Sequence, residues 1–170
     1  GAAAILVQQS HALRAADMLE NYLAYLRNLV AEAGGGHVQP VYGVGLEPGL
    51  TEKIATALPG YRGMGPVRVG NQAHEHLQHD VYGQIIPSTV QAFFDERLLR
   101  QATVEDFRAL EPVGERAYEV YATPDASLWE FRGREAIHTY SAVMCWAACD
   151  RLGNAAVQLG LLERAALWNA

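Results

Sequence analysis

Long apolar runs and an excess of positive charge are both absent from this 170-residue sequence. A membrane-spanning helix needs about 18 or more consecutive apolar residues, and no segment approaches that length, which argues against a membrane protein. The 13 lysine and arginine residues are outnumbered by 19 aspartate and glutamate residues, and the net charge is -6. Because binding to phosphate groups requires a basic surface, this balance argues against nucleic acid as the main partner. It is compatible with a neutral, polar ligand such as a sugar.

Cysteine is also scarce, because the sequence contains only Cys145 and Cys149. Their spacing places both side chains on one face of a predicted helix, which is close to but not ideal for a disulfide bond. We therefore expect a buried pair of free thiols. Free thiols are typical of reducing compartments, so the expected localisation is cytoplasmic.

Strand signals are nearly absent, and only residues 38–44 alternate between apolar and polar positions. Apolar residues recur instead at helical spacing, which predicts an all-α chain. Thr103 and Asp106 have the spacing of a capping box, and Pro87 is expected to kink or divide its helix. The predicted helices span residues 9–33, 71–96, 103–121, 139–159 and 161–170.

The connections between these helices alternate between long and short. Residues 38–66 are rich in proline and glycine and predict a long irregular segment, and such segments are usually functional or disordered. A short connection follows the second helix, and a turn with an irregular stretch covers residues 123–134. Alternating connections of this kind indicate helical hairpins, the unit from which toroidal helical barrels are built.

Three sequence blocks carry recognisable motifs. Residues 39–44 read QPVYGV, and residues 58–83 read LPGYRG, then GPVRVGNQA, then LQHDVYG. Residues 125–151 contain LWEFRG followed by TYSAVMCWAACDR. In this order and at these intervals, the blocks resemble the glucoamylase-type glycoside hydrolases of family 15, including members that act on trehalose or dextran. Ala142 stands where the family pattern has a lysine.

The resemblance covers nearly the whole chain and implies its fold and activity. It implies an (α/α)6 barrel, in which loops at one end form a funnel-shaped sugar pocket, and residues 1–170 would be the middle portion of that barrel as one partial domain. The implied activity is the cleavage of α-glucosidic bonds with inversion, in an oligosaccharide, dextran or trehalose. The family needs no cofactor and no catalytic metal for this reaction.

The resemblance also assigns the acid catalyst. Glycosidic cleavage takes two carboxyl groups, one to protonate the leaving oxygen and one to activate water or attack directly. The general acid of the family is the glutamate of its W-E motif, which corresponds to Glu130. This residue lies between Trp129 and Phe131, and an acid must stay protonated in an apolar or crowded setting. Without the resemblance, such a glutamate would be interpreted as a solvated surface charge.

Sugar contacts follow from the same motifs. Trp129 would form a wall of the pocket, and the backbone carbonyl of Leu128 would hold a sugar hydroxyl. Arg132 would either bind a carboxylate and orient the loop or have a plain structural role. The remaining candidates lie in the second block, where Arg68 and Asn71 have the alternative role of bracing a helix start; they are Tyr61, Arg62, Arg68 and Asn71.

Polar residues between 74 and 82 permit two further interpretations. Gln78, Asp80 and Tyr82 are expected to form a buried hydrogen-bond network inside a helix. The run from His74 to His79 suggests a metal site, but the zinc motif H-E-x-x-H requires a second histidine where Gln78 stands. We therefore predict no metal site.

The second carboxylate, the general base, is not identifiable in this chain. The chain also has too few predicted helices to close an (α/α)6 barrel. We therefore expect a fragment of a longer enzyme, inactive alone, or a chain completed by other chains. A non-catalytic helical domain derived from the family, which oligomerises or binds a partner, is the alternative. In each case the open helix faces would expose apolar surface and favour association, either with copies of itself or with the rest of the parent enzyme.

Overall fold

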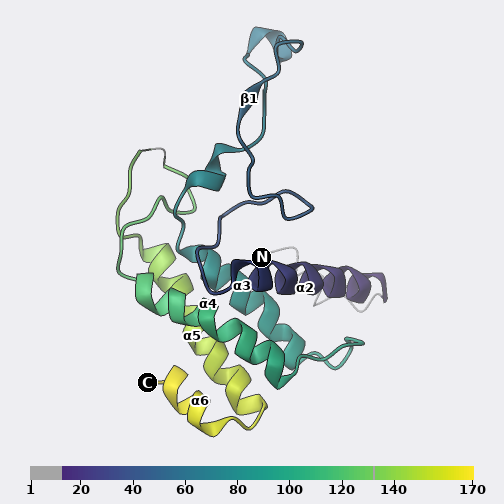
Figure 1. The fold of residues 1–170 in the computed structure, drawn as a ribbon, viewed down its shortest axis with the longest axis vertical. Helices are drawn as coiled ribbons and strands as arrows, with labels where there is room; N and C mark the ends of the chain where they lie inside the picture. Colours follow the sequence, from purple (N-terminus) through teal and green to yellow (C-terminus); the bar gives the residue numbers. More distant parts are fainter. Residues whose placement is uncertain (1–12, 132) are drawn as a thin grey trace.

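The computed structural model describes residues 13–131 and 133–170 (Figure 1). Its described part is mostly helical, which confirms the all-α prediction and is consistent with part of an (α/α)6 barrel. The α-helices are α2 (Leu13–Ala33), α3 (Asp80–Val90), α4 (Val104–Val120), α5 (Thr139–Gln158) and α6 (Leu162–Trp168). Short 3-10 helices are η1 (Tyr61–Gly63), η2 (Gln72–Glu75) and η3 (Gln91–Phe93), and the two strands are β1 (Lys53–Ile54) and β2 (Arg68–Val69).

Two short strands lie in and directly after the long irregular segment that the sequence predicts over residues 38–66. Residues 38–44 form no strand despite their alternating pattern. Instead β1 and β2 pair as an antiparallel ribbon, with Lys53 opposite Val69 and Ile54 opposite Arg68. Residues 38–71, which we call the arm, carry this ribbon away from the helices and place η1 near its tip (Figure 1).

Helix starts follow local signals where those signals exist. The capping box at α4 is confirmed, since Thr103 Oγ1 accepts from the Asp106 amide and Asp106 Oδ2 accepts from the Thr103 amide at 2.8 Å. The predicted helix over residues 71–96 is wrong at its beginning, because α3 starts only at Asp80. The amide of His79 donates to the Asp125 carboxylate rather than to a helical carbonyl. Pro87 lies inside α3 and does not divide it.

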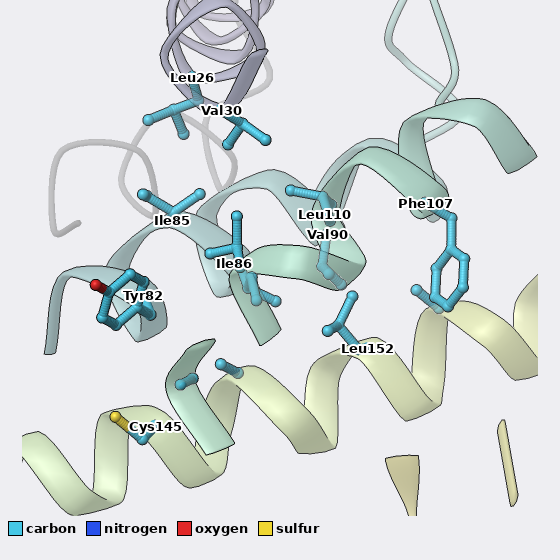
Figure 2. Close-up of a cluster of buried hydrophobic side chains, with 14 of the residues drawn as sticks. Leu26, Val30, Tyr82, Ile85, Ile86, Val90, Phe107, Leu110, Cys145 and Leu152 are labelled. Carbon is cyan, nitrogen blue, oxygen red and sulfur yellow. The ribbon is translucent and has the colours of Figure 1, made fainter. Parts of the chain in front are cut away.

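The core forms around α5, which packs against α3, α4 and α6. Figure 2 shows apolar side chains of α2, α3 and α4 gathered over α5, with Leu152 pointing into the cluster. α3 and α5 lie close together at Gly83, where an added Cβ would collide with the backbone of Met144. Cys145 of α5 belongs to the same cluster, and both Cys145 and Cys149 carry free thiols, as the sequence predicts. The prediction that both thiols are buried is wrong for Cys149, which is partly exposed.

The two long connections leave the helices at the same end. Residues 34–79, which include the arm, join the end of α2 to the start of α3, and residues 121–138 join the end of α4 to the start of α5 (Figure 1). The shorter connections, residues 91–103 and 159–161, lie at the opposite end. The predicted alternation of long and short links is therefore present. None of the helices in residues 13–131 and 133–170 combines the length and the apolar character needed to cross a bilayer.

Candidate active site

The connection between α4 and α5 holds Glu130 in a closed loop. Asp125 and Ala136 exchange two backbone hydrogen bonds, of 3.0 and 3.1 Å, and so join the two ends of the loop, residues 125–136. Inside it, the Glu130 amide donates to the Ser127 carbonyl at 3.0 Å, and the Phe131 amide donates to the Ala126 carbonyl at 3.1 Å. We call residues 125–136 the Glu130 loop.

The tip of this loop is exposed while its base is buried. Trp129 is 76% exposed, and Leu128, Glu130 and Phe131 are also exposed, whereas Asp125, Ala126 and Ser127 are buried. Glu130 has a φ of 52°, a backbone conformation that is uncommon for residues other than glycine. The tight turn therefore presents the carboxyl side chain to solvent. The described residues do not supply the crowded setting that the sequence suggests for an acid.

Aromatic and cationic side chains flank the loop. Phe131 stacks on the His138 imidazole, with 6.1 Å between ring centroids. The guanidinium of Arg134 lies over the Phe131 ring, 5.9 Å from its centroid. Arg132 lies outside the described residues, so its proposed role remains a prediction.

A set of polar contacts fastens the base of the loop to α3 and α5. Asp125 Oδ2 accepts hydrogen bonds from the His79 amide at 2.9 Å and from Ser141 Oγ at 2.7 Å. The His79 imidazole lies 2.9 Å from Thr123 Oγ1 and 3.2 Å from the Pro124 carbonyl. Burial lowers the pKa of His79, and the negative charge of Asp125 opposes that shift. The neutral imidazole is therefore favoured in the fold.

Sequence reasoning did not assign a role to Asp125, His79 or Ser141. Asp125 stands at the start of the third motif block, but a single aspartate before a turn is a common surface residue. The sequence suggests His79 only as a metal ligand, and it carries no signal for the Ser141 hydroxyl. Two hydrogen bonds join these residues: His79 and Asp125 are 46 positions apart, and Asp125 and Ser141 are 16 positions apart. Local sequence patterns carry no signal for such distant pairs.

Gln78, Asp80 and Tyr82 are all buried, as the sequence predicts, but the predicted hydrogen-bond network is incomplete, because Gln78 Nε2 and Asp80 Oδ1 have no partner in the described residues. Gln78 precedes α3 rather than lying inside it. Burial raises the pKa of Asp80, and the nearby negative charge of Asp125 raises it further. Gln84 connects this region to α5, because its amide donates to the Tyr140 hydroxyl at 2.7 Å.

The candidate sugar ligands of the second block lie along the arm. Tyr61, at its tip, is 72% exposed, and the Arg62 guanidinium lies 5.2 Å from the centroid of its ring. Arg68 forms an ion pair with Glu52 across the strand ribbon. The Asn71 side chain accepts from the Ala73 amide at 3.0 Å and caps η2. Arg68 and Asn71 thus have the bracing contacts that were their alternative role, and their role toward a sugar remains a prediction.

The histidine run does not converge on one point. His74 Nδ1 lies 2.9 Å from the Asn71 carbonyl, while the His79 imidazole contacts Thr123 and Pro124. Within the described residues, no three histidine, cysteine, aspartate or glutamate side chains are placed to hold a metal ion together.

Comparison with known proteins identifies the class. The sequence model of the glycosyl hydrolases family 15 matches residues 19–170, which include the arm, the Glu130 loop and the helices α3–α6. The chain therefore belongs to this family.

Individual proteins similar to this chain include several trehalases. A trehalase of Mycobacterium tuberculosis is 37% identical over 134 residues, which cover 78% of this chain and 19% of that protein. A trehalase of Thermoplasma volcanium is 33% identical, with 78% and 21% covered, and trehalase 2 of Sulfolobus acidocaldarius is 27% identical, with 89% and 25% covered. The chain thus spans between a fifth and a quarter of the length of these relatives. No solved structure matches it.

Proposed function

We propose that this chain is the middle portion of the barrel of an α-glucoside hydrolase and that Glu130 is its general acid. The observation that supports this most is the geometry of the Glu130 loop. It is a closed turn with a firmly fixed base, and it presents one carboxyl group next to an exposed tryptophan, at the end of the helices where the arm also begins. A carboxyl group so held can meet a substrate without steric obstruction from its own loop.

The proposed reaction is the hydrolysis of one glycosidic bond. Glu130 donates its proton to the glycosidic oxygen as the bond between that oxygen and the anomeric carbon breaks. Water attacks the anomeric carbon from the opposite face, which inverts its configuration, and a second carboxylate takes the proton of that water. That general base is not identifiable in this chain. No cofactor and no metal takes part in this reaction.

Trehalose is the first substrate to test. The relatives reported above are named trehalases, and the resemblance of the sequence motifs also allows oligosaccharides or dextran. Trp129 offers an exposed aromatic face of the kind that lines ligand pockets, and the Leu128 carbonyl lies beside it on the loop tip. Tyr61, Arg62 and the remaining residues of the arm would complete the sugar contacts, together with Arg132. Carbohydrate is the partner of this site, rather than nucleic acid or a membrane.

The free thiols of Cys145 and Cys149 support a cytoplasmic location for this enzyme. Burial raises the pKa of Cys145 to about 12. Both thiols therefore remain protonated and unreactive near neutral pH.

The test begins with the mass of the native gene product that contains this chain, followed by glucose release from trehalose, maltose and isomaltose. Glu130→Gln keeps the shape of the side chain and removes its acidic proton. We expect it to lower kcat by about 10²- to 10⁴-fold without loss of thermal stability. Glu135→Gln is the matched control, because it makes the same change at another exposed glutamate of the same loop, and it should retain wild-type activity. Wild-type activity in Glu130→Gln would rule out the acid role.

A non-catalytic interaction domain is the second candidate, and one observation favours it. An open groove of about 910 Å³ lies between α4, α5 and α6. Its walls include Tyr118, Trp146 and Leu167, all more than half exposed. A native product of about the present length that releases no glucose and self-associates would favour this function over hydrolysis.

A further inference from the structure

One buried carboxylate holds the Glu130 loop to the helices. Asp125 is fully buried, and its Oδ2 atom accepts one hydrogen bond from the amide of His79, directly before α3, and one from Ser141 in the first turn of α5. Its backbone also closes the loop through Ala136. A single residue thus connects two helices to both ends of the loop that carries Glu130.

Neighbouring contacts reinforce this attachment on one side. The Ala126 amide donates to the Leu77 carbonyl at 2.8 Å, and the Cys145 thiol donates to the His79 carbonyl at 3.4 Å. The His79 ring also contacts Thr123 and Pro124. These contacts hold residues 77–79 next to residues 123–126. The buried part of this attachment consists of His79, Asp125, Ala126 and Ser127, and the loop becomes exposed from Leu128 onward.

Burying the Asp125 carboxylate at this attachment lowers the stability of the fold. A buried carboxylate is expensive unless it is paired with a cation and fully hydrogen-bonded. In the described residues the hydrogen bonds to the Asp125 side chain come from neutral groups, and its Oδ1 atom has no hydrogen-bond partner. Asp80, a second buried carboxyl group, lies close enough to interact with it electrostatically. A neutral or apolar residue would avoid this cost, so a role beyond stability is needed.

We propose that Asp125 is a positioning residue that, through His79 and Ser141, sets the place of the Glu130 carboxyl group relative to the sugar. This rests on the proposed function, in which Glu130 is the general acid. A misplacement of about 1 Å can lower the rate about 10²-fold. Loss of the Asp125 contacts would therefore slow the reaction while Glu130 itself remains intact.

The test compares two substrates that differ in their need for an acid. The glycosidic oxygen of trehalose needs a proton to leave, whereas fluoride leaves α-glucosyl fluoride as a stable anion. Asp125→Ala, which removes the oxygen that accepts from His79 and Ser141, is made in the native gene product that contains this chain, beside Glu130→Gln. For both variants we expect kcat/KM to fall at least about tenfold more on trehalose than on α-glucosyl fluoride. A variant that only destabilises the fold would lower kcat/KM on trehalose and on α-glucosyl fluoride by the same factor.

Ser141→Ala and Thr89→Val complete the design. Ser141→Ala removes only one donor to Asp125 and should show the same selective fall at smaller amplitude, so it decides the question if Asp125→Ala does not fold. Thr89→Val removes a buried hydrogen bond to the Ile85 carbonyl within α3, and it should lower stability with an unchanged ratio between the two substrates.

The outcomes separate this proposal from the proposed function. If Glu130→Gln shows the selective fall, but Asp125→Ala and Ser141→Ala lower kcat/KM equally on both substrates or not at all, the positioning role is wrong and the acid role stands. If the wild type cleaves neither substrate, or Glu130→Gln shows no selective fall, the acid role fails and the positioning role fails with it.

Discussion

At the scale of single residues, the two buried carboxyl groups of Asp80 and Asp125 are the least ordinary feature of this chain. Asp125 accepts two hydrogen bonds through one oxygen, while Asp80 Oδ1 has no partner in the described residues. Burial and then the charge of Asp125 raise the pKa of Asp80. The fold therefore favours a proton on Asp80, and Asp125 remains the acceptor for His79 and Ser141.

This arrangement predicts a stability that depends on pH. Because the pKa of Asp80 is higher in the folded than in the unfolded state, its ionisation costs stability as pH rises through that folded-state value. Asp80→Asn removes this cost. We expect the free energy of unfolding of the variant, minus that of the wild type, to increase as pH rises from about 3 to about 7, measured by urea denaturation. Tyr140 and Cys145 also interact with Asp80, but their pKa values are raised and they do not titrate in this range.

Asp95→Asn is the matched control with the opposite sign. A hydrogen bond from Arg97 lowers the pKa of Asp95, so that residue stabilises the fold above its unfolded-state pKa and this contribution is lost as pH falls. The free energy of unfolding of Asp95→Asn, minus that of the wild type, should therefore decrease as pH rises. If this difference changed with pH by the same slope in Asp80→Asn and in Asp95→Asn, the assignment of the proton to Asp80 would be contradicted.

The residues that the sequence identified and those that it missed differ in a physical sense. Glu130 lies in a contiguous motif, and its turn is stabilised by bonds within the loop, from Glu130 to Ser127 and from Phe131 to Ala126. The support of that loop depends instead on His79 and Ser141, which are far from Asp125 along the chain. Such contacts exist only after the helices have packed, so local sequence does not indicate them.

At the scale of helices and strands, the same distinction explains which boundaries could be predicted. The start of α4 follows from Thr103 and Asp106, which bond to each other, and Gly160, with a φ of 71°, follows the end of α5 as expected for a glycine after a helix. The start of α3 depends on a distant carboxylate, so periodicity alone extended that helix too far toward its beginning. The strand ribbon was missed because two-residue strands carry no periodic signal.

Close packing of α3 on α5 gives a prediction at this scale. In an isolated helix, Gly83→Ala would be stabilising by about 1 kcal/mol. Here the added Cβ would meet the Met144 carbonyl and its neighbouring atoms, so the helices must separate. We expect a net destabilisation of about 1–3 kcal/mol, measured by chemical denaturation. Gly49→Ala, at a position with no atom near the added Cβ, should change stability little, and a neutral Gly83→Ala would contradict the observed proximity.

At the scale of the whole molecule, the described elements present two separate surfaces. The arm and the Glu130 loop share one end of the helices (Figure 1), where the candidate site lies. The groove between α4, α5 and α6 is a separate surface, lined by aromatic side chains and by Glu115, Glu119 and Asp150. Monomeric proteins rarely expose large apolar patches, so this groove is the surface that sequence analysis expected of a chain with open helix faces.

The last prediction concerns this groove in the isolated 170-residue chain. Trp146 and Leu167 are 63% and 54% exposed and face the groove from α5 and α6, so burying them against another molecule would be favourable. We expect the chain to self-associate in sedimentation velocity, and the double variant Trp146→Gln, Leu167→Gln to raise the dissociation constant at least about tenfold. The control, Val44→Gln with Leu99→Gln, removes two apolar side chains that are even more exposed but lie outside the groove, and it should associate like the wild type. A chain that stays monomeric at every concentration would mean that the groove does not drive association, whereas equal weakening by both variants would place the contact elsewhere on the surface.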